Sequence, residues 1–300
     1  MAAAAATPTD DAVVVPDPRD TVAAKILRAV AGLPLRIILI VIGALWIVPT
    51  AGLFLTSILP ASSLASKGWW QIFSKPSLAT WSNYHALFQN SGLVTALKTT
   101  AYIAVSNTLL VVILGAMAGY AFAWLDFPGR DWAFIAVIAL LVVPIQMALI
   151  PMFRLYGTLH LFDTWYGIAL FHTAFGLPFA IFLLRNFFVG LPKDILESAR
   201  IDGASEIVIF LRLILPLGLP AIASLAIFQF LWTWNDLLVA LTFGQNTTPI
   251  TVWISGQLRE FGTSIDIIAP ASFISLIVPL CVFFAFQRYF VQGLLAGSVK

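Results

Sequence analysis

The chain has 300 residues, of which 60% are apolar and only 10% are charged, and its formal net charge is +2. Together with a mean hydropathy of +0.96, this composition lies outside the range of soluble globular domains. The chain has no basic run with interleaved aromatic residues, which excludes nucleic acid as an expected partner. The apolar residues fall in blocks long enough to cross a bilayer as helices, so we expect an all-α integral membrane protein.

The N-terminal segment 1–30 precedes the first apolar block. Its first 20 residues are rich in Ala, Pro and Asp, and they carry four acids and one arginine. This composition lacks the positive start and the short apolar core of a secretory signal. We expect a disordered cytoplasmic tail that ends in a short amphipathic segment, followed by a transmembrane domain over 31–300.

Six apolar blocks are long enough to span the hydrocarbon core. We predict transmembrane helices at 37–59, 94–124, 132–153, 165–188, 213–241 and 269–291. In the second block, Gly115, Gly119 and Ala123 recur every four residues. This stripe of small residues predicts close packing against another helix.

The distribution of basic residues predicts the orientation of the spans. An even number of spans puts both chain ends on one side. If that side is the cytoplasm, five of the 16 Lys and Arg residues lie outside and the other eleven inside. Short loops rich in Lys and Arg stay in the cytoplasm, so we expect N-in, C-in topology. The five outer residues are Lys67, Lys75, Lys98, Arg154 and Arg259.

The longest outer segment, 61–93, is rich in aromatic residues. Such residues suit a helix that lies at the level of the lipid headgroups. The alternative is a docking surface for an external partner. The aromatic residues are Trp69, Trp70, Phe73, Trp81, Tyr84 and Phe88.

A hydrophilic segment at 185–212 follows the fourth span. Pro192 suits the first turn of a helix, and Asp202-Gly203 is a turn signal, so we predict a short helix over about 193–201. This interpretation leaves two possibilities open, a solvated loop with a turn in it and a docking surface for another protein.

The segment after this turn continues toward the fifth span. Ser205 is expected to cap a second helix that runs into that span past Pro216. Ala199 and Gly203 are small and four residues apart, so we expect them to let the bend press into a groove of a partner.

The sequence E-S-A-R-I-D-G-A at 197–204 favours the docking surface. It resembles the EAA motif of bacterial ABC importer permeases, whose pattern is E-A-A-x-x-D-G-A with prolines downstream, and Ser198 replaces one alanine. Other stretches are similar to the second permease of maltose-type sugar importers. They are GYAFAWLDFPGR at 119–130, LFDTWYGIAL at 161–170, TWNDLL at 233–238 and QRYFVQGLLAGSVK at 287–300.

The resemblance implies a six-span permease with a coupling helix between the fourth and fifth spans, and a transport subunit rather than an enzyme. In this family the EAA segment docks in a cleft of an ATPase. ATP and Mg²⁺ would bind to separate ATPase subunits, and the chain has no G-x-x-x-x-G-K-[ST] phosphate loop of its own. The implied coupling residues are Glu197, Ser198, Ala199, Arg200, Asp202, Gly203, Ala204 and Pro216.

The implied function is import of a sugar by ATP-driven alternating access, with a disaccharide or α-glucoside favoured. Another solute such as glycerol phosphate is the alternative. The implied partners are a second, non-identical permease, two ATPase subunits, an extracytoplasmic solute-binding protein and the bilayer. A passive channel would not need the docking segment, and a membrane enzyme would need converging catalytic groups.

Polar and aromatic residues near the end of the fifth span are candidates for the solute path. An acid and an amide in a membrane are costly unless they are paired or hydrated, and aromatic rings suit the faces of sugars. The alternative is that Asp236 caps a helix and the tryptophans mark the interface. The candidates are Trp232, Trp234, Asn235 and Asp236, with Asn107 and Thr108 on the second span.

Histidines and cysteine give no sign of a metal site. His85, His160 and His172 show no metal-ligand spacing, and single histidines of this kind are more often packing or interfacial residues. Cys281 is the one cysteine, so the chain has no cysteine metal motif. We expect no metal and no cofactor bound to this chain.

Overall fold

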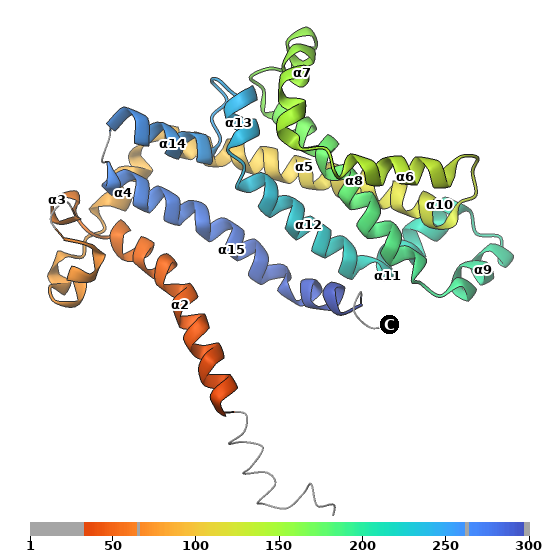
Figure 1. Ribbon diagram of the computed structural model, residues 1–300, viewed down its shortest axis with the longest axis horizontal. Helices are drawn as coiled ribbons and strands as arrows, with labels where there is room; N and C mark the ends of the chain where they lie inside the picture. The colour runs from red at the N-terminus through yellow and green to blue at the C-terminus, as the bar shows by residue number, and fades with distance from the viewer. Residues whose placement is uncertain (1–32, 65–66, 262–263, 297–300) are drawn as a thin grey trace, which may run out of the picture. The chain divides into compact units, whose positions relative to one another are not determined.

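The computed structural model describes residues 33–64, 67–261 and 264–296, and every regular element in this part of the chain is helical (Figure 1). The all-α prediction is therefore confirmed, whereas the tail at 1–30 lies outside the described residues. The helices are α2 (Leu33–Ser57), α3 (Ala61–Leu64), η2 (Trp69–Phe73), η3 (Pro76–Leu78), α4 (Ser82–Gln89), α5 (Ser91–Trp124), α6 (Arg130–Leu140), α7 (Ile145–Thr158), α8 (Trp165–Val189), α9 (Lys193–Ile201), α10 (Glu206–Ile209), η4 (Phe210–Ile214), α11 (Leu215–Leu217), α12 (Leu219–Trp234), α13 (Leu238–Phe243), α14 (Ile250–Phe261) and α15 (Ile265–Ala296).

The chain consists of two compact units, residues 1–52 and 53–300. The described part of the first unit is most of α2, which carries no charged residue after Arg36 and so meets the demand of a bilayer span. The second unit holds all the other helices and every residue predicted to act in coupling or transport.

Four of the described helices are long and apolar enough to cross a membrane by themselves. They are Pro34–Ser57 of α2, Ser91–Trp124, Trp165–Val189, and Ile265–Arg288 of α15. The predicted spans at 37–59, 94–124, 165–188 and 269–291 agree with these helices to within a few residues.

The other two predicted spans are bent pairs rather than single helices. The expected span at 132–153 is α6 and α7, which meet at 100°. The break lies just before Pro144, whose ring disfavours a helical conformation in the preceding residue. The expected span at 213–241 is also interrupted, because the helix Glu206–Leu217 meets α12 at 75° and α12 ends at Trp234. Six spans result only if each bent pair counts as one.

The packing of α5 against α8 is the centre of the second unit, and Figure 1 shows the two helices side by side. An added Cβ at Gly115 would lie 2.7 Å from the Cβ of Ala180, and one at Gly119 would lie 3.1 Å from the Cβ of Leu184. The close packing predicted from the small residues of α5 is therefore confirmed. It brings the backbones of α5 and α8 together as one block.

Candidate functional site

The helix predicted in the hydrophilic segment is α9, Lys193–Ile201. It follows Pro192, whose missing N–H removes no helical hydrogen bond at this position. It ends in a Schellman motif, in which the N–H groups of Ala204 and Gly203 donate to the carbonyls of Ala199 and Arg200, both at 3.0 Å. Gly203 has a φ of +82°, which glycine adopts without a steric penalty. The predicted turn at Asp202-Gly203 is confirmed.

One face of α9 packs on its own chain. Leu196 is fully buried and lies in the same apolar cluster as Phe188 of α8 and Ile209 of α10. Ala199 is half-buried and packs against this cluster. The small side chain of Ala199 therefore helps to fit α9 to the body of this chain, and its expected contact with a partner stays a prediction.

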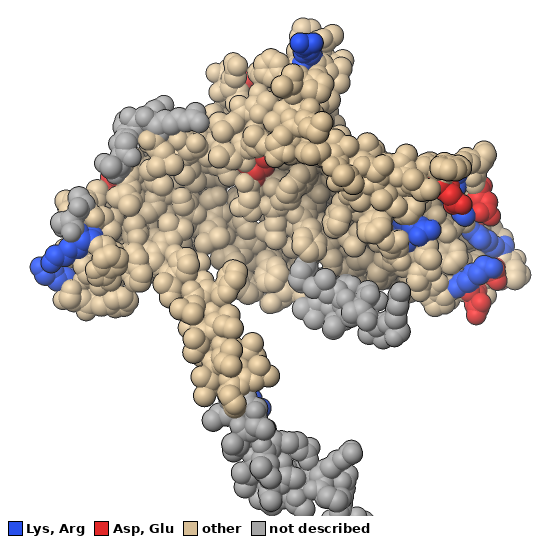
Figure 2. Space-filling model, in the orientation of Figure 1, with Lys and Arg blue, Asp and Glu red and all other residues tan. Residues whose placement is uncertain are grey.

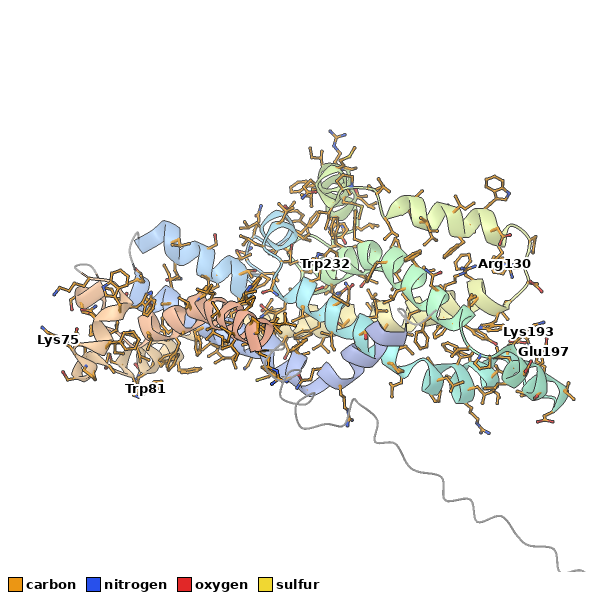
Figure 3. The ribbon with its side chains drawn as sticks, turned by 60° about the horizontal axis from the view of Figure 1, so that its bottom comes forward. Lys75, Trp81, Arg130, Lys193, Glu197 and Trp232 are labelled. Atoms are coloured by element: carbon orange, nitrogen blue, oxygen red, sulfur yellow. The ribbon has the colours of Figure 1, made fainter. Side chains whose placement is uncertain are left out.

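The other face of α9 is exposed. Asp194, Glu197, Ser198 and Ile201 recur at intervals of three or four residues, so they share one side of the helix. Ile201 is 85% exposed, a large value for an isoleucine outside an apolar span. Nζ of Lys193 lies 2.7 Å from Oε1 of Glu197, and Figure 3 shows both residues at the α9 end of the unit.

Arg200 turns toward its own chain. Its Nε donates to Oε1 of Glu206 at 2.9 Å, and its Nη2 donates to the carbonyl of Trp124 at 3.3 Å. Glu206 also accepts a hydrogen bond from the hydroxyl of Tyr120. The hydrogen bond with Glu206 raises the pKa of Arg200 above its ordinary value. Arg200 therefore positions α9 against α5 and α10, and Glu206 is a residue that the list of sequence candidates missed.

The connection from α9 to α12 differs from the prediction, which was a helix capped by Ser205 that continues into the fifth span. Ser205 occupies the N-cap position of α10, but its side chain makes no capping hydrogen bond within the described part of the chain. The chain then passes through the π-helical turn η4 and through α11, where Pro216 is exposed. At Gly218 the path bends by 75°. The helix after Ser205 is thus not a straight extension of α12.

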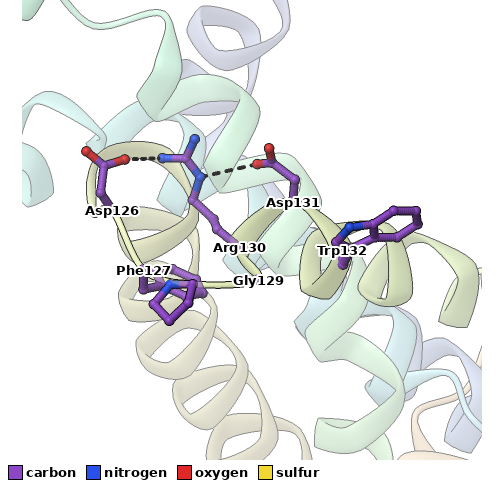
Figure 4. Close-up of a pocket in the computed structure, with 7 residues that line it drawn as sticks. Asp126, Phe127, Gly129, Arg130, Asp131 and Trp132 are labelled. Atoms are coloured by element: carbon purple, nitrogen blue, oxygen red, sulfur yellow. Dashed lines mark hydrogen bonds and ion pairs between the residues drawn. The ribbon is translucent and has the colours of Figure 1, made fainter.

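Charged side chains gather at the end of the unit where α9 and α10 lie (Figure 2). The turn between α5 and α6 adds to them. In this turn, Arg130 lies 2.9 Å from Asp126 through Nη1 and 3.3 Å from Asp131 through Nε (Figure 4). Both carboxylates are largely exposed, at 98% and 84%, so each pair contributes only about 0–1 kcal/mol to stability. The turn borders an open hollow of about 510 Å³.

Asp236 caps a helix and also has a buried partner. Its carboxylate accepts hydrogen bonds from the N–H groups of Val239 and Ala240 at 3.3 and 3.0 Å, which caps α13. Its Oδ2 lies 3.4 Å from Nε2 of His172, a buried residue on α8. No role for His172 is predicted from the sequence, because the two residues are far apart in the chain. The neighbouring Asn235 is exposed.

The two tryptophans of α12 differ in their surroundings. Trp232 is 42% exposed, and its ring meets the ring of His172 edge-on at 5.0 Å. Trp234 is buried, stacks on Phe230 and donates from Nε1 to the carbonyl of Ser275 at 3.0 Å. Trp234 therefore packs α12 against α15, and this burial does not fit its predicted place on a solute path.

Asn107 and Thr108 lie within the helix bundle. Asn107 is fully buried, and its amide donates to Oγ1 of Thr233 at 2.6 Å and accepts from the hydroxyl of Thr173 at 3.2 Å. These bonds engage both ends of the amide and connect α5, α8 and α12, so Asn107 acts here as a cross-link rather than as a solute ligand. The buried hydroxyl of Thr108 has no hydrogen-bond partner among the described residues.

A second carboxylate joins two loops. Asp163, between α7 and α8, accepts hydrogen bonds from the N–H groups of Asn246 and Thr247, both at 2.7 Å. Burial alone would raise the pKa of Asp163, but the hydrogen bonds from Thr247 and Asn246 outweigh it and lower the pKa below its ordinary value of 3.8. Asp163 is therefore ionised at neutral pH and ties the α7–α8 loop to the α13–α14 loop.

Metal ligands do not come together in the described part of the chain, where no group of three or more His, Cys, Asp or Glu residues could hold an ion. Among the described residues, His172 is the one histidine that lies within ion-pair distance of a carboxylate. The candidate residues described above are charged, hydrogen-bonding and aromatic side chains.

The sequence of residues 111–295 matches the model of a protein family described as the inner membrane component of binding-protein-dependent transport systems. The chain belongs to this family. It is therefore an inner membrane permease subunit of an ABC importer and not an enzyme, and the family description makes a solute-binding protein part of the same system.

Several relatives of this permease are known. An osmoprotective compounds uptake permease of Synechocystis is 47% identical over 89% of this chain and 92% of the relative. An α-glucoside transport permease of Rhizobium meliloti is 48% identical over 75% of this chain and 61% of the relative. A trehalose transport permease of Mycobacterium tuberculosis is 36% identical over 75% of this chain and 84% of the relative.

The fold of this permease also matches solved structures. A chain of a bacterial ABC transporter that imports the acidic polysaccharide alginate superposes with a TM-score of 0.71 at 20% identity, covering 91% of this permease and 100% of that chain. At this identity the match establishes the fold, which is that of an ABC importer permease.

Proposed function

We propose that this chain is a permease subunit of a sugar importer, that ATP drives it by alternating access, and that α9 docks on an ATPase. The outward face of α9 carries this proposal. Ile201 is exposed among charged and polar neighbours of the same motif, and an apolar side chain ringed by polar ones is typical of a docking surface. ATP and Mg²⁺ bind to the ATPase subunits.

The attachment of α9 to the rest of the chain supports its role in coupling. Leu196 fixes α9 to the core beside α8, and the contacts of Arg200 with Glu206 and Trp124 fix it to α10 and α5. A force on α9 therefore reaches the α5–α8 block directly. Transmission requires an element with two arrangements, and we propose that the 75° bend at Gly218 is the hinge of this element.

The preference for a sugar rests on the relatives. Among those whose names specify a solute are transporters of α-glucosides, arabino-oligosaccharides and trehalose. We therefore propose a disaccharide or an α-glucoside as the solute. The name of the Synechocystis relative supports an osmoprotective compound as a second candidate, and glycerol phosphate stays as the alternative drawn from the sequence.

The proposed orientation places α9 and both chain ends in the cytoplasm. Figure 3 shows Lys193 and Glu197 at the end of the second unit opposite to Lys75 and Trp81. At the Trp81 end, large aromatic side chains are exposed, including Trp81 at 67%. Such side chains suit the interface between the inner membrane and water on its external side. The proposed assembly contains a second, non-identical permease, two ATPase subunits and an extracytoplasmic solute-binding protein.

The experiment that tests this function is reconstitution of the assembly in proteoliposomes. ATP hydrolysis is measured with the binding protein and a panel of maltose, trehalose, sucrose and glycerol 3-phosphate. We expect at least one disaccharide to stimulate hydrolysis and to be transported, whereas glycerol 3-phosphate does neither. If no carbohydrate in the panel stimulates ATP hydrolysis, the sugar assignment is refuted and the family assignment stands.

A further inference from the structure

A groove runs between α8 and α12, and its two walls are single faces of these helices. The residues on each wall recur at intervals of three or four, which puts them on one side of a helix. The wall on α8 comprises Phe175, Gly176 and Phe179, and the wall on α12 comprises Phe228, Gln229 and Trp232. Beside the groove, the buried His172 of α8 contacts Trp232 and also Asp236, which follows the end of α12.

Gln229 lies at the middle of this groove with an unused donor. Its side chain is only 4% exposed, and its Nε2 has no hydrogen-bond partner among the described residues. A buried amide donor without a partner is destabilising, because it has lost its hydrogen bonds to water. Gln229 therefore needs a polar group that is not supplied by the described part of this chain.

Gly176 makes the room in which the amide of Gln229 sits. A Cβ at residue 176 would lie 2.7 Å from both Nε2 and Oε1 of Gln229. An alanine there would force the amide to move. The absence of a side chain at Gly176 therefore allows the amide to occupy this position in the groove.

A pocket of about 310 Å³ opens over this amide. Its volume lies at the lower end of the range of small-molecule sites, about 300–1,000 Å³. Three of its rings are partly exposed, with Phe179 at 39%, Phe228 at 44% and Trp232 at 42%. The lining residues are Phe175, Gly176, Phe179, Phe228, Gln229 and Trp232.

The chemistry of this pocket fits a sugar ring better than a lipid tail. An acyl chain leaves the amide unpaired, which is unfavourable in a membrane. A pyranose has apolar C–H faces that pack on aromatic rings, and its hydroxyls accept from Nε2 and donate to Oε1 of an amide. We propose that the pocket at Gln229 and Trp232 is a subsite that holds one sugar ring of the solute during passage. This inference rests on the proposed sugar import.

The test compares variants of the complete importer in proteoliposomes, with maltose and trehalose as probes and the loaded binding protein at a fixed limiting concentration. Gln229→Leu removes the hydrogen bond, and Gly176→Ala displaces the amide. The matched control is Gly157→Ala on α7, where no described atom lies within 4 Å of an added Cβ. The quantities measured are sugar transported per ATP hydrolysed and the thermal midpoint of each complex.

We expect Gln229→Leu and Gly176→Ala to reduce transport per ATP about 2- to 10-fold, the factor that corresponds to one neutral hydrogen bond. The control keeps the wild-type ratio. Because leucine replaces an unpaired buried amide, Gln229→Leu also keeps or raises the thermal midpoint, which separates a lost subsite from a damaged fold. If Gln229→Leu fails to assemble, Trp232→Ala tests the same pocket, since its ring is partly exposed.

Two failures are distinguishable. If the wild-type importer transports a sugar and both pocket variants match it, the subsite is refuted and the sugar function stands. If the wild-type importer responds to no carbohydrate, the sugar function and the subsite are refuted together.

Discussion

Replacement of Ile201 by alanine tests the docking role of α9 at a single side chain. The change removes the three carbon atoms beyond Cβ. If the partner buries them fully, the loss is about 0.8 kcal/mol for each carbon, or about 2.4 kcal/mol. Since 1.4 kcal/mol corresponds to a factor of ten, the affinity for the ATPase should fall about 50-fold.

The permease itself should keep its stability in this variant. Ile201 is 85% exposed, so its truncation should change the free energy of unfolding by no more than about 0.5 kcal/mol. The matched control is Ile135→Ala, an exposed isoleucine on α6, which should leave ATPase binding unchanged.

The assay is binding of the purified ATPase to the permease pair in nanodiscs, followed by transport in proteoliposomes. We expect weaker ATPase binding and less transport for Ile201→Ala, with normal assembly of the permeases. Equal ATPase affinities for Ile201→Ala, Ile135→Ala and the wild type would refute the argument that the exposed face of α9 is the docking surface.

Three further predictions follow from the contacts of single residues. Gly203→Val should uncouple ATP hydrolysis from transport, because the backbone conformation with a φ of +82° costs a valine about 1–2 kcal/mol. Gly203→Asn should retain more coupling, because asparagine tolerates this conformation. The stabilisation from Asp163 should be complete above pH 3.8, its ordinary pKa, and should be lost as the pH falls through the lowered pKa of Asp163 in the folded state. Hydrogen exchange of the N–H group of Thr247 at pH 5 and pH 3 measures this loss, and equal protection factors at both pH values would contradict the prediction. Asn107→Leu should lower the thermal midpoint of the permease, because it leaves the buried Thr233 without its donor at a cost of about 1–3 kcal/mol; an unchanged midpoint would argue against the cross-link.

The sequence predicted α8 and α9 well because their signals are local. Apolar length determines α8, and the proline and glycine at its ends determine α9. The breaks were harder to predict, because proline does not act alone. Pro178 lies inside the unbroken helix α8, whereas Pro144 and Pro216 accompany sharp bends. The difference depends on whether neighbouring helices compensate the freed carbonyl groups, which is a property of the tertiary structure.

The candidate site was predicted unevenly for a similar reason. The motif identified α9, but not which of its residues face inward. The spacing of Leu196, Ala199 and Arg200 on one side of the helix was the available signal. The pairing of His172 with Asp236, and the unpaired amide of Gln229, depend on the contact between α8 and α12 and have no local signal.

The close packing of α5 on α8 has a consequence for how motion in this permease can be followed. Because Gly115 and Gly119 let the two backbones meet, α5 and α8 should travel as one rigid body. Spectroscopic labels placed on these two helices should therefore keep a constant separation through the transport cycle. A pair with one label on α8 and one on α12 should report the widening and narrowing of the groove, with the first pair as its internal ruler.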